Sequence, residues 1–239
     1  MIFPTGRFFI IYSEQKRVDM SDDSKVISLS LRAWRSNPDI YGILDSFSIK
    51  IQQEIYEMGK QRALWITQTG VFLAILIVAQ AVTRPLGNQF VSGSINNMLF
   101  ILAVMLIGLT SAMVVAVISP IIATILGLGP VLPPLIPVII AGNLVLVILW
   151  YFIAARQAER SKLREIIALI VAALVKFAVL YLGVVVLVVP LVLGLPEPQA
   201  STVSALFSWP QIVTASIGGV IAILIYTPLS KALPKKQNR

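Results

Sequence analysis

Long apolar runs without charge fill the chain from residue 63 onward. The longest of them, 98–128, has 31 residues and no charged side chain, whereas a helix of about 20 apolar residues already spans a bilayer. The whole chain is 57% hydrophobic and 13% charged, and a soluble domain usually carries about 25% charged residues. We therefore predict an all-α integral membrane protein and exclude a disordered chain, which would be polar and charged.

Residues 1–62 have a different character from this apolar region. They hold 9 of the 19 Lys and Arg residues and 8 of the 11 acids. Apolar residues recur near helical spacing in 44–58, which indicates an amphipathic helix on the cytoplasmic membrane surface. We predict a cytoplasmic extension at 1–62, partly amphipathic or disordered, a membrane domain at 63–230 and a basic cytoplasmic tail at 231–239. A solvated leader without function is the alternative for the extension.

The apolar runs predict the order of the membrane spans. We expect spans at about 64–84, within 98–128, from the proline-rich turn 129–137 to about 150–155, at 166–189 and at 207–227. The connections between them are a polar linker at 84–97, a basic loop at 156–165 and a loop at 190–206.

Charge decides whether 98–128 forms one span or two. A continuous helix there would be about 46 Å long, against a hydrocarbon core of about 30 Å, so a steep tilt could still accommodate it. A single span would put the basic loop 156–165 and the tail outside if the N-terminus is inside. A break near 108–111 places 17 of the 19 Lys and Arg residues inside, as positive charges prefer. We predict six helices with both termini cytoplasmic, the second and third of them short (96–109 and 111–127).

The chain lacks the residues that most membrane enzymes and pumps use. It contains no Cys and no His, so a thiol nucleophile, a serine–histidine dyad and the commonest metal ligand are absent. The acids after residue 62 are Glu159, Glu165 and Glu197, all in or beside predicted loops, and proton relays in membranes usually need such groups in the interior. No phosphate-binding loop is present. We expect neither an enzyme nor a cofactor or metal, and any transport would take its energy from a partner.

Lys176 is a cation inside a predicted span. Inserting a Lys near the bilayer centre costs about 2.5–3.5 kcal/mol. It shares a stripe of small residues with Ala168, Ala172 and Gly183, the kind of face that packs against other helices. The sequence leaves two readings open: an ammonium that faces a ligand, or one that snorkels or pairs with backbone carbonyls.

Other polar residues indicate a binding surface near the predicted outer face. The linker 84–97 could be a polar lining and lid or an ordinary loop. Asn143 could line a cavity or bond another helix. The candidate substrate-binding residues are Gln80, Arg84, Asn88, Gln89, Ser94, Asn96, Asn97, Asn143, Lys176, Tyr181, Trp209 and Gln211.

Four segments together resemble a known family over about residues 58–230. They are RALWITQTGVFLAILIVAQ (62–80), SINNMLFILAVMLIGLTSAMVVAVISPIIATILG (94–127), PPLIPVIIAGNLVLVILW (133–150) and FSWPQIVTASIGG (207–219). In style and order they are similar to the substrate-binding S components of energy-coupling factor (ECF) vitamin transporters.

The resemblance implies a fold, a function and partners. Such proteins are six-helix, multi-pass proteins of the bacterial cell membrane that bind a vitamin or micronutrient from outside. They deliver it with a transmembrane coupling subunit that carries two ATPases. Docking on that subunit uses an Ala-x3-Ala motif in the first helix, whose nearest match here is Gly70-x3-Ala74. Members usually begin shortly before this helix, so Met58 is a candidate start.

Two other functions stay open at this point. The chain could be a secondary carrier that acts alone, although the lack of intramembrane acids argues against it, or an assembly subunit of a membrane complex without a ligand. If it is an S component, Arg84 and Lys176 hint at an anionic group on the substrate.

Overall fold

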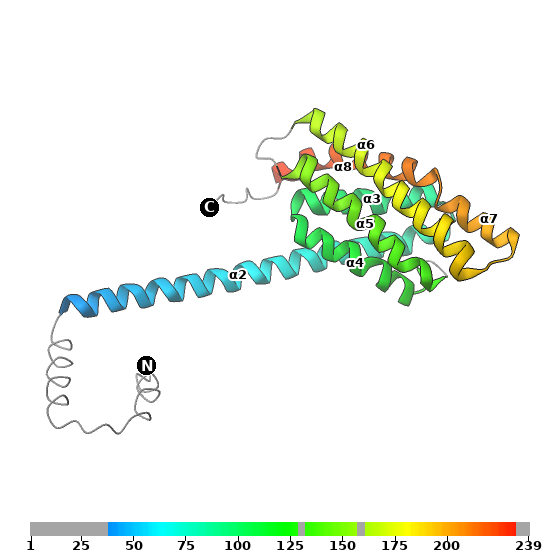
Figure 1. Ribbon diagram of the computed structural model, residues 1–239. Coiled ribbons are helices and arrows are strands. Elements are labelled where there is room, and N and C mark those ends of the chain that lie inside the picture. Colours follow the sequence, from blue (N-terminus) through cyan, green and yellow to red (C-terminus); the bar gives the residue numbers. More distant parts are fainter. Residues whose placement is uncertain (1–37, 129–131, 157–160, 233–239) are drawn as a thin grey trace, which may run out of the picture. The chain divides into compact units, whose positions relative to one another are not determined.

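The computed structural model describes residues 38–128, 132–156 and 161–232. The described residues are almost all helical and include no strand (Figure 1). The chain divides into two units, 1–60 and 61–239. In the first unit the described residues form the beginning of helix α2 (Pro38–Thr83), and most of the side chains from 45 to 60 are exposed.

The predicted helix 44–58 is therefore present, as part of a much longer helix. Its position on a membrane surface stays a prediction. The predictions for residues 1–37 and for 233–239 concern residues outside the described part of the chain.

The second unit is a bundle of helices joined by short connections. After the end of α2 it contains η1 (Arg84–Leu86), α3 (Gln89–Leu106), α4 (Leu109–Ile125), η2 (Pro133–Leu135), α5 (Ile136–Trp150), η3 (Tyr151–Ala155), α6 (Lys162–Leu180), η4 (Tyr181–Leu193), α7 (Glu197–Leu206) and α8 (Pro210–Ala232). The segments η1 and η2 are 3-10 turns, whereas η3 and η4 are π-helical continuations of α5 and α6.

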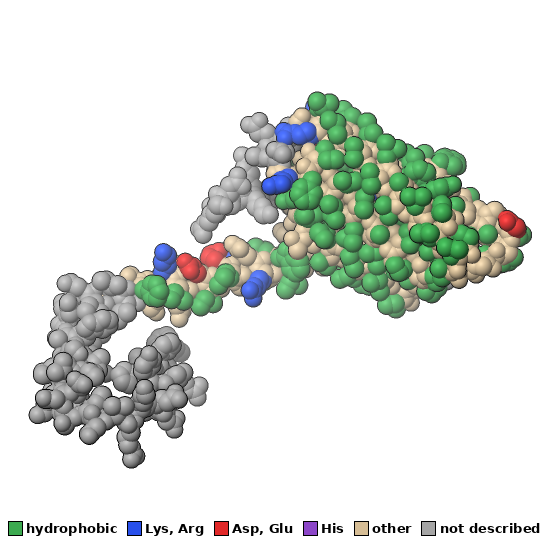
Figure 2. Space-filling model, viewed as in Figure 1, with side chains coloured by type: hydrophobic (Ala, Val, Ile, Leu, Met, Phe, Trp, Pro, Cys, Tyr) green, Lys and Arg blue, Asp and Glu red, His purple; other side chains and the backbone are tan. Residues whose placement is uncertain are grey.

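The described helices suit a multi-pass membrane protein. Five of them are long and apolar enough to cross a membrane, and α4 is a shorter apolar helix. In Figure 2 hydrophobic side chains cover the visible face of this unit, whereas Lys and Arg side chains gather at the end where α6 begins. The count of six spans and the cytoplasmic side of both termini stay predictions.

The chain breaks inside the long run 98–128 as the charge argument predicted. Helix α3 ends at Leu106 and α4 begins at Leu109. Between them Gly108 has a φ of 97°, in the region that favours glycine because it has no Cβ. The third helix, α4, is short as predicted, with 17 residues. The prediction of a short second helix is wrong, because α3 has 18 residues and is long enough to cross a membrane.

The start of α3 corrects the predicted linker. Helix α3 begins at Gln89 rather than near residue 96, so most of 84–97 is helical. The reason is the cap: Asn88 Oδ1 accepts hydrogen bonds from the backbone N–H of Phe90 (2.9 Å) and of Val91 (3.4 Å), which satisfies two free donors of the first turn. The Ser and Asn residues that suggested a loop therefore lie along the first turns of a helix.

A second correction concerns the loops at 156–165 and 190–206. Helix α6 begins at Lys162, inside the predicted basic loop. The ten residues of α7 lie inside the predicted loop 190–206. Glu197 and Pro198 lie in its first turn. The backbone N–H groups of a first turn have no partner within the helix, so a proline, which has no N–H, costs no hydrogen bond there. The carboxylate of Glu197 interacts favourably with the positive end of the helix dipole. The prolines that indicated a loop thus start a short helix.

Small residues bring α3 and α8 very close together. A Cβ placed on Gly218 of α8 would lie 2.5 Å from the backbone oxygen of Ser94 and 2.8 Å from Cβ of Asn97. Ala168 and Ala172 of α6 and Ala222 of α8 are fully buried in the same hydrophobic core as Trp150. Lipid is as apolar as the side chains, so close backbone approach is a main source of helix association.

We expect Gly218→Ala to destabilise the protein by about 1–3 kcal/mol, the usual cost of overpacking. The new methyl group would press on backbone atoms of α3 that cannot move aside. Thermal unfolding in detergent measures the loss. Gly59→Ala is the matched control, because a Cβ there meets nothing within 4 Å. Equal midpoints for the two variants would contradict the close contact.

Candidate functional site

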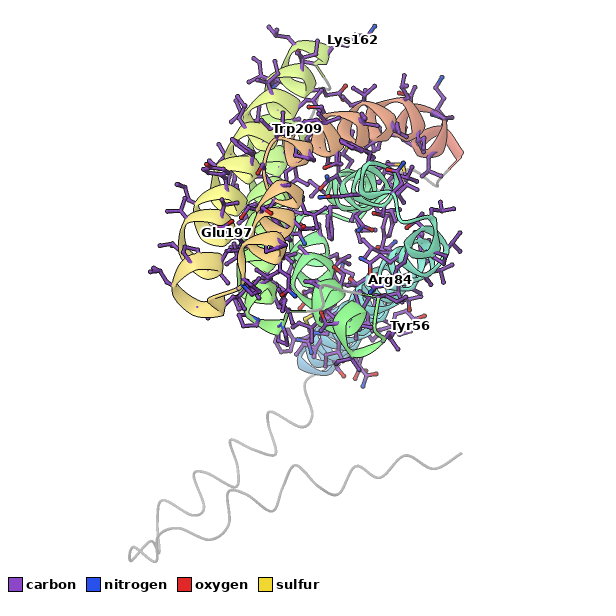
Figure 3. All side chains as sticks on the ribbon, turned by 90° about the vertical axis from the view of Figure 1, so that its right-hand side faces the viewer. Tyr56, Arg84, Lys162, Glu197 and Trp209 are labelled. Atoms are coloured by element: carbon purple, nitrogen blue, oxygen red, sulfur yellow. The ribbon has the colours of Figure 1, made fainter. Side chains whose placement is uncertain are left out.

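A cavity of about 660 Å³ lies in the second unit, at the end where α3 begins. This volume is in the range of pockets that hold small organic ligands. Figure 3 looks onto this end of the unit, with Arg84 after α2, Glu197 on α7 and Trp209 just before α8. Side chains from every helix from α2 to α8 contribute to the lining.

Lys176 of α6 stands at the centre of the polar part of this lining. Its Nζ donates hydrogen bonds to Oδ1 of Asn97 on α3 (2.5 Å) and to Oδ1 of Asn143 on α5 (2.9 Å). The three side chains are 2–6% exposed, so the polar group is nearly dry. An ammonium group in such a place needs acceptors, because burying it without partners costs several kcal/mol.

The network extends to α8 and to an aromatic ring. Asn97 Nδ2 donates to Oγ1 of Thr214 (3.4 Å), and Thr214 is 1% exposed. The Lys176 Nζ lies 5.9 Å from the ring centroid of Phe100, within the range of a cation–π interaction. The polar contacts therefore join α3, α5, α6 and α8.

The helix positions explain the depth of this network. Asn97 follows Gln89, the first residue of α3, by about 12 Å at 1.5 Å per residue. Lys176 follows Lys162, the first residue of α6, by about 21 Å on the same basis. The ammonium therefore lies deep inside the bundle. It is away from the end where α3 begins and also from the end where α6 begins, at which the Lys and Arg side chains gather (Figure 2). Ala168 and Ala172 of its stripe are buried, as the sequence predicted.

Two glutamines fasten the cavity wall that α7 forms. Gln89 Nε2 (2.5 Å) and Gln211 Nε2 (2.9 Å) both donate to the backbone oxygen of Leu206. Leu206, Val203 and Phe207 line the cavity from this side. The short helix therefore becomes part of the cavity wall, held by the beginnings of α3 and α8.

The structure brings most of the predicted residues together. The cavity lining includes Gln80, Arg84, Asn88, Gln89, Asn96, Asn97, Asn143, Lys176 and Gln211. For Lys176 the contacts differ from the snorkelling reading, since its partners are side-chain amides inside the bundle. Asn143 fits both alternatives given for it, because it lines the cavity and also accepts a hydrogen bond from Lys176 of another helix.

Three predicted residues lie outside this lining. Ser94 is buried where α3 meets α8. Tyr181 is 38% exposed and packs on Phe177. Trp209 is 62% exposed and packs on Phe90, with ring centroids 5.8 Å apart.

Sequence reasoning missed the apolar part of the lining. Phe100, Leu135, Ile139 and Leu180 line the cavity from α3, η2, α5 and α6. Nothing in the sequence separates them from apolar residues that face lipid. Ser119 and Pro120 of α4 also line the cavity. A polar residue next to a proline inside an apolar helix was the sequence signal that could have identified this position.

A sequence model of the family described as the substrate-specific component of ECF transporters matches residues 65–230. The chain therefore belongs to this family. The match covers every residue found to line the cavity and confirms the resemblance. Comparisons with curated proteins and with solved structures gave no match.

Membership of the ECF substrate-specific components confirms that the chain is a multi-pass membrane transport component and not an enzyme. The groups that line the cavity are suited to binding a small organic molecule. The lining offers amide groups, hydroxyls, two cations and apolar walls. Among the described residues no group of His, Cys, Asp or Glu could hold a metal ion.

We expect Lys176 and Asn143 to be strongly coupled in a double-mutant cycle. Asn143→Leu takes one acceptor from the buried ammonium, whereas in Lys176→Met no ammonium is left to satisfy. The destabilisation caused by Asn143→Leu should shrink by about 1 kcal/mol or more in the Lys176→Met background. Thermal unfolding of the four proteins in detergent measures this coupling. Additive effects would show that the hydrogen bond contributes nothing.

Proposed function

We propose that this ECF substrate-specific component captures a vitamin or related micronutrient at the outer face of a bacterial cell membrane. A separate coupling subunit and ATPase pair then drives its delivery to the cytoplasm. The observation that carries this proposal is the cavity with its buried Lys176–Asn97–Asn143 network. An expensive buried polar group in a membrane protein usually marks a substrate site.

The proposed orientation follows from the two ends of the bundle. Arg156, Lys162, Arg164 and Lys231 lie at the ends of η3, α6 and α8 that are remote from the cavity lining. Cationic loops stay in the cytoplasm. Six spans with both termini inside then place the opening of the cavity outside, where a scarce nutrient has to be captured.

We expect one compound among the water-soluble vitamins and their precursors to stabilise the purified protein. A ligand at 100 times its dissociation constant adds about 2.7 kcal/mol, which a thermal-shift screen detects easily. The same compound should not accumulate in vesicles that contain this chain alone. A folded protein that none of the panel stabilises would favour an assembly subunit, and uptake by the chain alone would favour a secondary carrier.

We also propose that Gly70 and Ala74 belong to the surface that docks on the coupling subunit. Both lie on one face of α2 and are exposed, and a Cβ on Gly70 would meet nothing within 4 Å. Val71, Ile75 and Val78 beside them are exposed as well. Small residues on an apolar helix face allow another helix to approach closely.

We expect Gly70→Leu and Ala74→Leu to reduce co-purification with the coupling subunit and ATPases at least tenfold. The ligand-induced thermal shift should stay unchanged, because neither residue lines the cavity. Ala141→Leu on α5 is the matched control, since Ala141 is also exposed. Full capture by both α2 variants would place the docking surface elsewhere.

A further inference from the structure

The charge of the cavity is unbalanced, and this imbalance extends the proposed function to a class of substrate. Among the described residues, the lining contains two cations, Lys176 and Arg84, and no Asp or Glu. Lys176 is buried, whereas Arg84 is exposed towards the end where the cavity opens. A dry cation and no anion in the same cavity make a site whose field favours a negative ligand.

The contacts of Lys176 leave one of its N–H donors without an acceptor among the described residues. An ammonium group has three N–H donors, and two of them are directed at Asn97 and Asn143. Both acceptors are neutral amide oxygens, so they solvate the charge without cancelling it. Among the described residues no third acceptor is found for Nζ, which faces the ring of Phe100 instead.

A second donor stands beside the ammonium. The hydrogen bond found for Asn143 among the described residues uses its Oδ1. Its amide N–H2 group is therefore free to donate within the cavity that it lines. An ammonium N–H and an amide N–H together match the two oxygens of one carboxylate.

The remaining lining sets the other requirements for a ligand. Leu132, Leu135, Ile139, Val203 and Phe207 form apolar walls. The side-chain oxygens of Gln80 and Asn96 are buried without a hydrogen-bond partner in the described part of the chain, and both residues line the cavity. Buried acceptors are costly to leave unpaired, so they call for donors on the ligand.

We propose that the cavity binds an amphiphilic organic monoanion through a carboxylate that contacts Lys176 and Asn143. Its apolar body lies against the walls from η2, α5 and α7, and its hydroxyl or amide N–H groups donate to Gln80 and Asn96. A single buried cation balances one negative charge, which favours a carboxylate over a phosphate ester with its nearly doubled charge. This inference rests on the proposed function.

The test compares acids with neutral partners of nearly the same shape. The probes are nicotinate and nicotinamide, biotin and biotinamide, pantothenate and pantothenol, and lipoate and lipoamide, with pyridoxal phosphate and pyridoxal as the phosphate pair. Thermal shift at a series of concentrations gives the apparent affinity of each for the full-length protein. We expect at least one carboxylate to bind ten times or more tightly than its neutral partner.

Lys176→Met should abolish this preference for the acid. Lys162→Met is its matched control, because it removes the same charge from the exposed start of the same helix, outside the cavity. The control should keep the preference of the native protein.

Asn97→Asp tests the idea without removing the lysine. The new carboxylate would stand where Asn97 Oδ1 lies, at hydrogen-bond distance from Nζ, and would act as an internal counter-ion. We expect the empty variant to unfold at a higher temperature and to bind the acid at least ten times more weakly. Gln53→Glu, which adds the same charge at an exposed position of α2, controls for net charge.

The outcomes of these measurements decide between the inference and its alternatives. A preference for the acid that disappears in Lys176→Met and Asn97→Asp supports the inference. Equal binding of the neutral partner, or an acid preference that survives Lys176→Met, overturns it and leaves the proposed function standing. Binding of pyridoxal phosphate with no response to carboxylates overturns the choice of a carboxylate. If neither these probes nor any compound of the wider vitamin screen stabilises the protein, the proposed function fails and this inference fails with it.

Discussion

The bonds of one buried lysine determine how the polar half of the bundle is built. Lys176 Nζ is held by amide oxygens of Asn97 and Asn143, and Asn97 reaches Thr214. These contacts connect four helices at one depth. Hydrophobic burial gives little preference between a helix neighbour and a lipid neighbour, so directional bonds of this kind and close packing decide which helices meet.

Close packing and polar bonding depend on each other here. Gly218 lets α8 approach the backbone of α3 at the turn that carries Asn97. The same approach brings Thr214, one turn earlier on α8, within 3.4 Å of the Asn97 amide. The Asn97 side chain is thereby fixed with its oxygen towards Lys176. Gly218, which has no side chain, thus helps to position the Asn97 amide although it forms no hydrogen bond with it.

Charge and helical spacing predicted much of this arrangement, for physical reasons. The bias of cations to one side predicted the break that the structure places at Gly108, and the small-residue stripe predicted that Lys176 faces the bundle. The helix α7 was missed because Pro196 and Pro198 indicate a loop as readily as a helix start. The apolar lining was missed because Leu135 or Leu180 could equally face lipid. Which apolar residues face a cavity is settled only when the helices pack.

The pair of hydrogen bonds from Gln89 and Gln211 that holds α7, here called the clamp, has an evolutionary consequence. Gln89 and Gln211 bind the main-chain oxygen of Leu206, an atom that every amino acid has. Substitutions at 203, 206 or 207 can therefore change the shape of the cavity wall while the clamp and the lysine network stay intact. A lineage that inherits this bundle can acquire a new substrate by altering one short helix, without rebuilding the part of the protein that holds the charge.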